Sequence, residues 1–456
     1  MRSQWRALCA LLALALVALA AGCGGSSGSS SSSGGGSVAP SEDKTPVTLT
    51  LWHPWTGDEK KIFEAQLTKF EQQYPWITVK AVGYPDSDTF DDQVIKAIKG
   101  GNGPDAVLSF GPDYDGQYCS SGLMQDLSNY MDQDGVSIDQ FAPAAITYTN
   151  FDDKQCMLPS LTDSFGLYYN KDMFAKAGIT SPPKTMTELM DDAKKLTVKN
   201  SDGTIKVAGF VPLQDFEQLG IYDLARMWGA KFFDDNGDPV LASDPAWASA
   251  LEWQKQMIDY YGYDNIIKFN AAYGGDNEFS ASNAFETGKV AMMFDGEWRT
   301  AFIKREHPEL NYGTAFFPSA DDHPDLYGSQ RVGGTVVGIP QGSKYPNQAW
   351  LLVKFLSTDP GYITTMANQV GNVPTTVETA SSPDLKLPEQ FQPFIDVWQN
   401  KDSSFFPPLT TAGRGYFLPL QQFVDKWQAG NVSDLQSGLQ GVDEQIKNNL
   451  ALGDQP

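Results

Sequence analysis

The sequence has few residues of the kinds that build metal or redox sites. Its 456 residues include four cysteines and three histidines. The histidines (His53, His307 and His323) lie far apart, and no cysteine–histidine spacing is typical of a zinc site. The chain also lacks the phosphate loop of ATPases and the G-x-G-x-x-G motif of dinucleotide-binding enzymes. We therefore expect no metal, no cofactor and no ATP hydrolysis in this chain.

Positive charge is also scarce. There are 33 lysines and arginines against 56 aspartates and glutamates, so the formal net charge is −23. Nucleic acid and anionic membrane surfaces would repel such a chain, which disfavours both as direct partners, and we expect no nucleic-acid binding. The hydrophobic fraction of 41% is enough for a large core, and the length allows two or three domains.

The longest apolar run is too short to cross a membrane. It extends from Ala7 to Ala21, follows Arg2 and Arg6, and predicts an export signal over residues 1–22. Leu19-Ala20-Ala21-Gly22-Cys23 resembles a bacterial lipobox, which implies a diacylated Cys23. An ordinary signal cleaved near Ala21 is the alternative. The Gly- and Ser-only stretch 24–37 cannot build a core and predicts a flexible tether within residues 23–44.

Two cysteines remain in the rest of the chain, Cys119 and Cys156. An even pair in an exported domain favours one disulfide, although two separate buried thiols would also fit the count.

The folded part begins with an alternation of strands and helices. Residues 47–52 and 77–82 are rich in β-formers, and 105–110 follow the same pattern. Between them, helical spacing predicts helices after Thr56-Gly57-Asp58-Glu59, interpreted as a capping box, and over 90–99. This βαβαβ order predicts a parallel sheet in an α/β fold, with ligands beyond the carboxyl ends of its strands.

Several motifs along the chain resemble one family, the family 1 extracellular solute-binding proteins, or maltose-binding-protein class, of ABC importers. They are L-W-H-P-W-T-G (51–57), G-N-G-P-D-A-V (101–107), G-L-M-Q-D-L (122–127), S-F-G-L-Y-Y-N-K-D-M-F (164–174), P-P-K-T-M-T-E-L (182–189), F-E-T-G-K-V-A-M-M-F-D-G-E-W (285–298) and G-I-P-Q-G-S-K-Y-P (338–346). Each motif is weak alone, and their order and spacing carry the resemblance.

The resemblance implies a two-lobe periplasmic-binding-protein fold of type II, with discontinuous lobes, a hinge and a ligand cleft between the lobes. It implies lobe one over 45–157 plus 299–357 and lobe two over 158–298 plus 358–456. The Cys119–Cys156 disulfide would then be a structural staple within lobe one. It also implies a monomeric binding protein, tethered to the outer face of the cell membrane, that delivers its ligand to permease subunits.

The aromatic content suggests a carbohydrate ligand. Sugars present C–H faces to flat rings and paired hydroxyls to carboxylate, amide and guanidinium groups, and the chain has 11 Trp and 18 Tyr. At the ends of the first and third strands the candidate ligand-binding residues are Trp52, His53, Trp55, Asp113 and Tyr114. Packing of both tryptophans in the lobe and an ordinary Pro-Asp turn are the alternatives.

The remaining candidates come from the middle and the end of the chain. Trp298 is the strongest, because it follows a strand and family members commonly stack an aromatic on sugar there, with Gly296 expected to supply a tight turn. The others are Asp163, Tyr168, Asp295, Arg331, Gly333, Gly334, Arg414 and Tyr416. The two arginines would otherwise be surface residues, and the glycines a plain bulge. Trp228 and Trp253 are expected in the core.

Three other functions fit the sequence less well. The same fold can bind a non-sugar solute such as a polyamine, a glycerophosphodiester or a metal. A secreted glycoside hydrolase with two carboxylates would show turnover of oligosaccharides. A surface adhesin or sensor would leave uptake unchanged when deleted. We expect a binding protein and not an enzyme.

Overall fold

The computed structural model describes residues 43–84, 89–400 and 403–453. Cys23, the export signal and the tether lie outside these residues, so those expectations stay predictions. Within the described residues, no helix is long and apolar enough to span a membrane.

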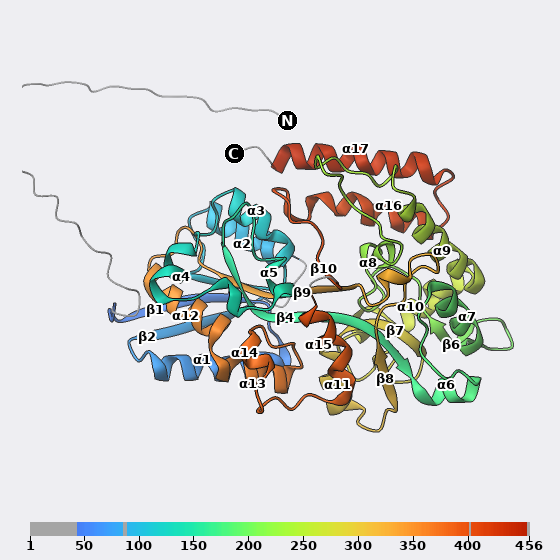
Figure 1. Ribbon diagram of the computed structural model, residues 1–456, viewed down its shortest axis with the longest axis horizontal. Coiled ribbons are helices and arrows are strands. Elements are labelled where there is room, and N and C mark those ends of the chain that lie inside the picture. The colour runs from blue at the N-terminus through green and yellow to red at the C-terminus, as the bar shows by residue number, and fades with distance from the viewer. Residues whose placement is uncertain (1–42, 85–88, 401–402, 454–456) are drawn as a thin grey trace, which may run out of the picture. The chain divides into compact units, whose positions relative to one another are not determined.

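The elements from Val47 to Ser109 form the expected βαβαβ unit (Figure 1). Its elements are β1 (Val47–His53), α1 (Gly57–Gln73), β2 (Ile77–Gly83), α2 (Phe90–Lys99) and β3 (Ala106–Ser109). Strand β1 pairs in parallel with β2 on one side and β3 on the other. The expected capping box is wrong, because the Thr56 side chain makes no cap hydrogen bond. The Glu59 carboxyl instead interacts electrostatically with Arg305 and Asp163.

A single long strand connects two portions of the ten-stranded sheet. The first half of β4 (Met157–Asn170) pairs with β9 (Gln330–Gly338), which in turn pairs with β3. Its second half pairs with β7 (Val290–Gly296) and β8 (Tyr312–Ala315). Figure 1 shows β4 running from the β9 side to the β7 and β8 side. The strand order is β2-β1-β3-β9-β4-β7-β6-β5, with β5 (Val198–Lys199) and β6 (Ile205–Phe210) at one end and β10 (Ser404–Phe405) paired with β9.

The backbone of β9 carries one conformation that only glycine adopts easily. Gly334 has φ +148°, and a Cβ there would lie 2.1 Å from the Leu161 carbonyl oxygen of β4. The close approach of β4 and β9 therefore requires Gly334, where the sequence alone allowed a bulge or a ligand contact.

Helices cover both portions of the sheet. The remaining α-helices are α3 (Asp115–Ser120), α4 (Ser128–Asp134), α5 (Pro143–Ile146), α6 (Lys171–Ala177), α7 (Met186–Leu196), α8 (Ile221–Arg226), α9 (Pro245–Tyr261), α10 (Tyr263–Tyr273), α11 (Arg299–Glu306), α12 (Pro346–Thr358), α13 (Pro360–Val370), α14 (Val377–Ala380), α15 (Gln392–Gln399), α16 (Leu418–Gln428) and α17 (Leu435–Gly453). Short 3-10 helices include η2 (Pro112–Tyr114) and η7 (Gly413–Tyr416).

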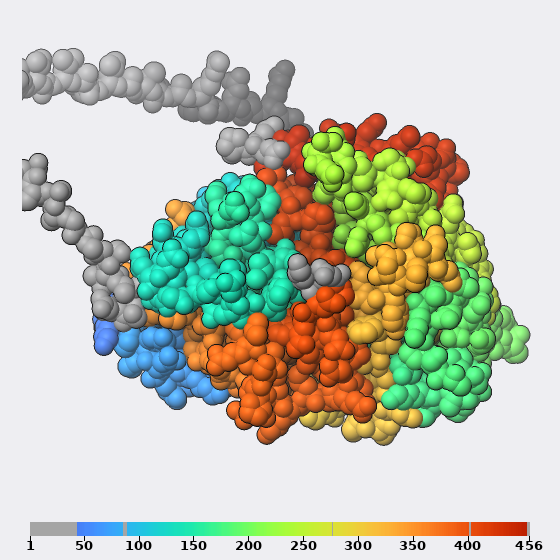
Figure 2. All heavy atoms as spheres, in the orientation of Figure 1, coloured from blue at the N-terminus to red at the C-terminus, as the bar shows by residue number. Residues whose placement is uncertain are grey.

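The buried apolar residues form two cores, and the larger of them also includes residues of α2, β3 and α3. One lies around β1, β3, α1, α12 and α13, and α13 packs directly on α1. The other includes β6, β7, α7, α9 and the C-terminal helices, and contains the buried Trp253, as expected. In Figure 2 the C-terminal residues (red) lie against the segment before α9 (lime), where Leu241 and Ala242 donate backbone hydrogen bonds to Asp443.

Cys119 and Cys156 form a disulfide with a Cα–Cα distance of 5.6 Å. The bond joins α3 to the residue before β4. Both cysteines are buried, so the bond lies inside the core next to the start of the long strand.

Candidate functional site

The carboxyl end of β1 places one of its three candidates at the surface. Trp52 is half-buried and lies 4.7 Å from Tyr84, ring centroid to ring centroid. His53 is fully buried next to Phe63, and burial, reinforced by Lys60, lowers its pKa to about 4. Trp55 is also buried, which agrees with the alternative that this tryptophan packs inside the lobe.

Phe110 is an exposed aromatic ring at the same sheet edge that sequence reasoning missed. It follows β3, is 39% exposed and meets Trp55 edge-on at 4.8 Å. Its position directly after a strand was the available signal, because ligands of parallel sheets bind beyond the strand ends.

Asp113 and Arg414 meet although 300 residues separate them in the chain. The Arg414 Nε atom lies 3.0 Å from Asp113 Oδ2, and both side chains are partly exposed. The backbones around them are also close: a Cβ on Gly116 would lie 2.4 Å from the Thr410 carbonyl oxygen. Their neighbours Tyr114 and Tyr416 are buried, Tyr416 against Phe232 and Phe233. The structure therefore brings the two charged candidates, Asp113 and Arg414, together and places the two tyrosines in the core.

Trp298 and Arg331 both contact the ring of Phe165. Trp298 is half-buried and lies edge-on to Phe165 at 5.4 Å, while the Arg331 guanidinium lies 3.8 Å above the Phe165 ring centroid. Arg331 Nε is 3.3 Å from Asp223 Oδ2, and the charges of Asp113 and Asp163 interact with Arg331. The Trp298 ring and the Arg331 guanidinium, which is paired with the Asp223 carboxylate, therefore both lie next to Phe165.

Gly296 positions Trp298 in a way that differs from the expected tight turn. It is the last residue of β7, it pairs with Phe165 and its φ is not positive. A Cβ at this position would lie 2.2 Å from Cζ3 of Trp298. Glycine is needed because the Trp298 indole lies over its backbone.

Asp163 is half-buried and belongs to a cluster of polar side chains from three segments of the chain. Its Oδ1 accepts a hydrogen bond of 2.7 Å from Asn372 Nδ2, and its charge interacts with that of Glu297. Glu297 is fully buried, and its Oε2 accepts a 2.7 Å hydrogen bond from the Ser164 backbone. Sequence reasoning missed Glu297 and Asn372, because nothing in their local sequence shows that they meet Asp163.

Asp295 and Tyr168 lie in the interior of the protein and not at the surface. Asp295 Oδ2 accepts a 2.6 Å hydrogen bond from Arg299, and the Tyr168 hydroxyl donates to the Gly296 carbonyl oxygen at 2.9 Å. Both side chains are fully buried. In this structure they support the turn that carries Trp298, whereas we expected them to contact ligand.

The two glycines of β9 differ in their surroundings. A Cβ on Gly334 would collide with β4, whereas among the described residues a Cβ on Gly333 would meet Phe406 alone, at 3.8 Å. Gly333 therefore leaves space beside a half-buried aromatic ring, and it pairs with Asp163 across the β4–β9 ladder. Phe406 is a further aromatic residue that the sequence did not single out.

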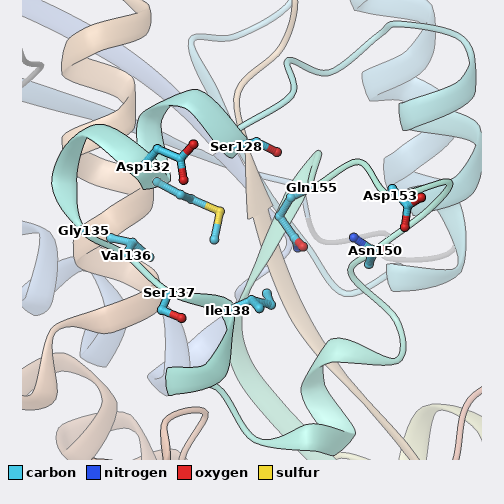
Figure 3. Close-up of a pocket in the computed structure, with 10 residues that line it drawn as sticks. Ser128, Asp132, Gly135, Val136, Ser137, Ile138, Asn150, Asp153 and Gln155 are labelled. Atoms are coloured by element: carbon cyan, nitrogen blue, oxygen red, sulfur yellow. The ribbon is translucent and has the colours of Figure 1, made fainter.

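A separate surface pocket of about 480 Å³ lies around α4 and the hairpin before Cys156 (Figure 3). It contains none of the candidate ligand-binding residues. Its lining mixes apolar and polar side chains, and its two charged members, Asp132 and Asp153, lie on opposite sides of it in Figure 3.

Known proteins with a similar sequence or structure point to one family. The sequence profile of the bacterial extracellular solute-binding proteins matches residues 54–363. The maltotriose-binding protein of Pyrococcus abyssi is 23% identical over 74% of this chain and 68% of its own length. A maltooligosaccharide ABC transporter solute-binding lipoprotein of Streptococcus pneumoniae is 27% identical over 71% of this chain and 70% of its own length.

A solved structure extends this similarity to the fold. CpMnBP1 with mannotriose bound superposes with a TM-score of 0.78 and 29% sequence identity, over 88% of this chain and all of that one. The long shared strand and the flanking α/β portions are thus those of a type II periplasmic binding protein. The chain belongs to the bacterial extracellular solute-binding protein family.

Proposed function

We propose that this protein is the substrate-binding component of an ABC importer, and that it captures a sugar or oligosaccharide in a cleft between its two lobes. The observation that carries this proposal is the convergence of Trp298, Asp163 and Arg331 from β7–α11, β4 and β9. A flat ring beside a carboxylate and a guanidinium is the combination that binds sugar C–H faces and hydroxyl pairs.

The charges at this place favour an uncharged ligand. Arg331 is paired with Asp223, and Arg414 with Asp113. A phosphate group would have to displace one of these carboxylates before it met a cation, which argues against a glycerophosphodiester. A polyamine would instead seek the carboxylates, so spermidine is the informative negative control.

The relatives indicate which sugars to test first. Those named above bind maltotriose, maltooligosaccharide and mannotriose. Mannobiose, mannotriose and maltotriose are therefore the first panel. Partly exposed aromatic rings at Trp52, Phe110, Phe406 and Trp298 support a ligand of more than one ring.

We assign the lobes from packing as well as from the resemblance. The expected boundaries were 45–157 plus 299–357 and 158–298 plus 358–456. The contact of α13 with α1 supports placing 360–370 in the first lobe, and the pairing of β8 with the second half of β4 supports placing that strand in the second. Delivery to permease subunits, a lipid anchor on Cys23 and a monomeric state complete the proposal.

Sugar-dependent stabilisation tests the function. A sugar at 100 times its Kd stabilises the folded state by about 2.7 kcal/mol, which a thermal-shift screen detects. Trp298→Ala should weaken binding tenfold or more, because the ring face is lost, while the unliganded protein stays folded. Trp228→Phe, a conservative change in a half-buried residue of the second core, is the matched control. Stabilisation by spermidine and not by any sugar would overturn the sugar assignment.

Turnover separates this function from a hydrolase. The purified protein incubated with the bound oligosaccharide should release no new reducing ends. A steady increase in reducing ends, lost in Asp163→Asn, would instead support a glycoside hydrolase.

A further inference from the structure

The Arg331 guanidinium on β9 is held by side chains from three other segments of the chain. Its Cζ atom lies 3.8 Å over the ring centroid of Phe165 on β4. Its Nε atom lies 3.3 Å from Asp223 Oδ2 on α8, and its Nη2 atom donates a hydrogen bond of 3.5 Å to Gln218 Oε1, in the connection from β6 to α8. The ring limits how far the group can move, and the two polar contacts limit its rotation.

The amide of Gln218 can face Arg331 in one orientation. Its Nε2 atom donates a hydrogen bond of 2.5 Å to Glu278 Oε1. A guanidinium has donors and no acceptor, so the amide oxygen must face Arg331 while the amide nitrogen faces Glu278. A flipped amide would place donors against donors and acceptors against acceptors. The contact between Gln218 and Arg331 is therefore specific to a carboxamide side chain.

The backbone around Gln218 is also fixed. Its N–H group donates a hydrogen bond of 3.2 Å to the Phe294 carbonyl oxygen of β7. The preceding residue, Glu217, has a left-handed φ of +51°. A residue other than glycine adopts this conformation at an energetic cost, and such residues are concentrated at functional sites. The strained backbone thus presents Gln218 at the carboxyl end of β7, beside Arg331.

Asp223 supplies a buried negative charge to the same group. Its side chain is 2% exposed, and its Oδ2 atom also accepts a 3.3 Å hydrogen bond from the Gly220 backbone. Its Oδ1 atom has no donor within residues 43–84, 89–400 and 403–453. Burial raises the pKa of Asp223 to about 6, against the attraction of Arg331, so the carboxylate is ionised at pH 7. A buried carboxylate with so few donors requires a neighbouring cation.

One nitrogen of the guanidinium is left for a ligand. In the described part of the chain no group accepts a hydrogen bond from Arg331 Nη1, and the side chain is 26% exposed. A guanidinium that is fixed before the ligand arrives loses less conformational freedom on binding, which increases affinity.

We propose that Gln218 and Asp223 are positioning residues for sugar binding: they hold the Arg331 guanidinium so that its Nη1 atom donates a hydrogen bond to a sugar hydroxyl. This inference rests on the proposed function. Neither residue contacts the sugar, and each acts through Arg331. The sequence singled out Arg331 as a candidate, but neither of its partners.

Removing either partner should weaken sugar binding. Gln218→Met keeps the length of the side chain and removes the amide, and Asp223→Asn keeps the shape and removes the charge. Each should weaken mannotriose binding about tenfold, because a hydrogen bond or ion pair to the guanidinium is lost. Gln392→Met is the matched control, since Gln392 also donates to a carboxylate, that of Asp396, but at the exposed surface of α15. Unchanged affinity in both Gln218→Met and Asp223→Asn would overturn the proposal.

A double-mutant cycle distinguishes positioning from a merely structural role. Arg331→Met removes the guanidinium and should itself weaken binding at least tenfold. In that background Gln218→Met should weaken binding by no more than about twofold further, because the group that it positions is gone. A larger further loss would show that Gln218 supports the site by another route and would overturn its assignment.

Calorimetric titration of the purified protein with mannotriose at pH 7 measures these affinities, and thermal unfolding without ligand checks that each variant is folded. If the wild type binds none of mannobiose, mannotriose and maltotriose, the proposed function fails on its own.

The positioning of Arg331 is then tested without ligand by nitrogen NMR. The Arg331 Nε–H signal is assigned by its absence from the spectrum of Arg331→Met. It should shift in Gln218→Met and in Asp223→Asn and stay in place in Gln392→Met. A signal that either of the first two substitutions leaves unchanged would overturn the role of that residue.

Discussion

At the scale of single residues, the placement of Trp298 depends on the missing side chain of Gly296. The indole lies over the Gly296 backbone, so that a Cβ there would lie 2.2 Å from the ring. Contacts this short force one of the two groups to move. Because pairing with Phe165 and the hydrogen bond from the Tyr168 hydroxyl hold the Gly296 backbone against β4, the ring is the group that is free to shift.

Gly296→Ala should therefore weaken sugar binding about tenfold with little loss of stability. The backbone can accept the change, because the φ of Gly296 is not positive. Calorimetry should show the loss of affinity, and thermal unfolding without ligand should change by only a few degrees. Gly342→Ala is the control, since a Cβ there meets nothing within 4 Å. Unchanged affinity in Gly296→Ala would mean that the position of the Trp298 ring does not matter for binding.

At the scale of elements, the link from β7 to α11 rests on a buried charge network. Arg299, the first residue of α11, contacts Asp295 at 2.6 Å, Glu286 at 3.0 Å and Glu217 at 3.5 Å, and all four side chains are fully buried. Three carboxyls share one guanidinium, so the network carries excess negative charge unless it binds protons. Burial, together with the Asp295 carboxyl and against the attraction of Arg299, raises the pKa of Glu217 to about 8.

This shift makes stability depend on pH with a definite sign. The folded state keeps a proton on Glu217 up to about pH 8, whereas the unfolded chain loses it near pH 4.5. The stabilisation is complete below the unfolded pKa and is lost as the pH rises through the folded value. The free energy of unfolding should thus fall between pH 5 and pH 9, by at most about 1.4 kcal/mol per pH unit for one proton.

Glu217→Gln should flatten that slope and make the protein more stable than wild type at pH 9. The glutamine mimics the protonated acid and can still accept the 2.9 Å hydrogen bond from Asn283. Denaturant unfolding at pH 5, 7 and 9 measures the slope. Glu444→Gln on the exposed face of α17 should leave it unchanged. An equal slope in Glu217→Gln and wild type would assign the pH dependence to other groups.

At the scale of the whole molecule, the sequence predicted the local elements better than the site. The βαβαβ unit is confirmed, because its signals lie within short windows of apolar periodicity and turn residues. The capping box does not form, since the Thr56 side chain makes no cap hydrogen bond, and the Glu59 carboxyl interacts with charges from distant segments. Likewise, the contact of Asp113 with Arg414 and that of Asp163 with Asn372 join residues hundreds of positions apart. Such meetings depend on the fold as a whole, so local patterns could name Asp163 but not its partners.

Within the whole molecule, we assign capture of the ligand and its delivery to different parts of the chain. Every residue to which we assign a role in binding lies after residue 44, whereas Cys23 and the Gly-Ser stretch 24–37 precede the described part of the chain. If lipidation of Cys23 only holds the protein near its permease, Cys23→Ser should leave sugar affinity unchanged. Cells carrying the variant should lose labelling by radioactive fatty acid, release the protein from the membrane fraction and take up the sugar slowly. Normal uptake by a released protein would show that the anchor is dispensable, and reduced affinity of the purified variant would show that residues before 44 contribute to the binding site.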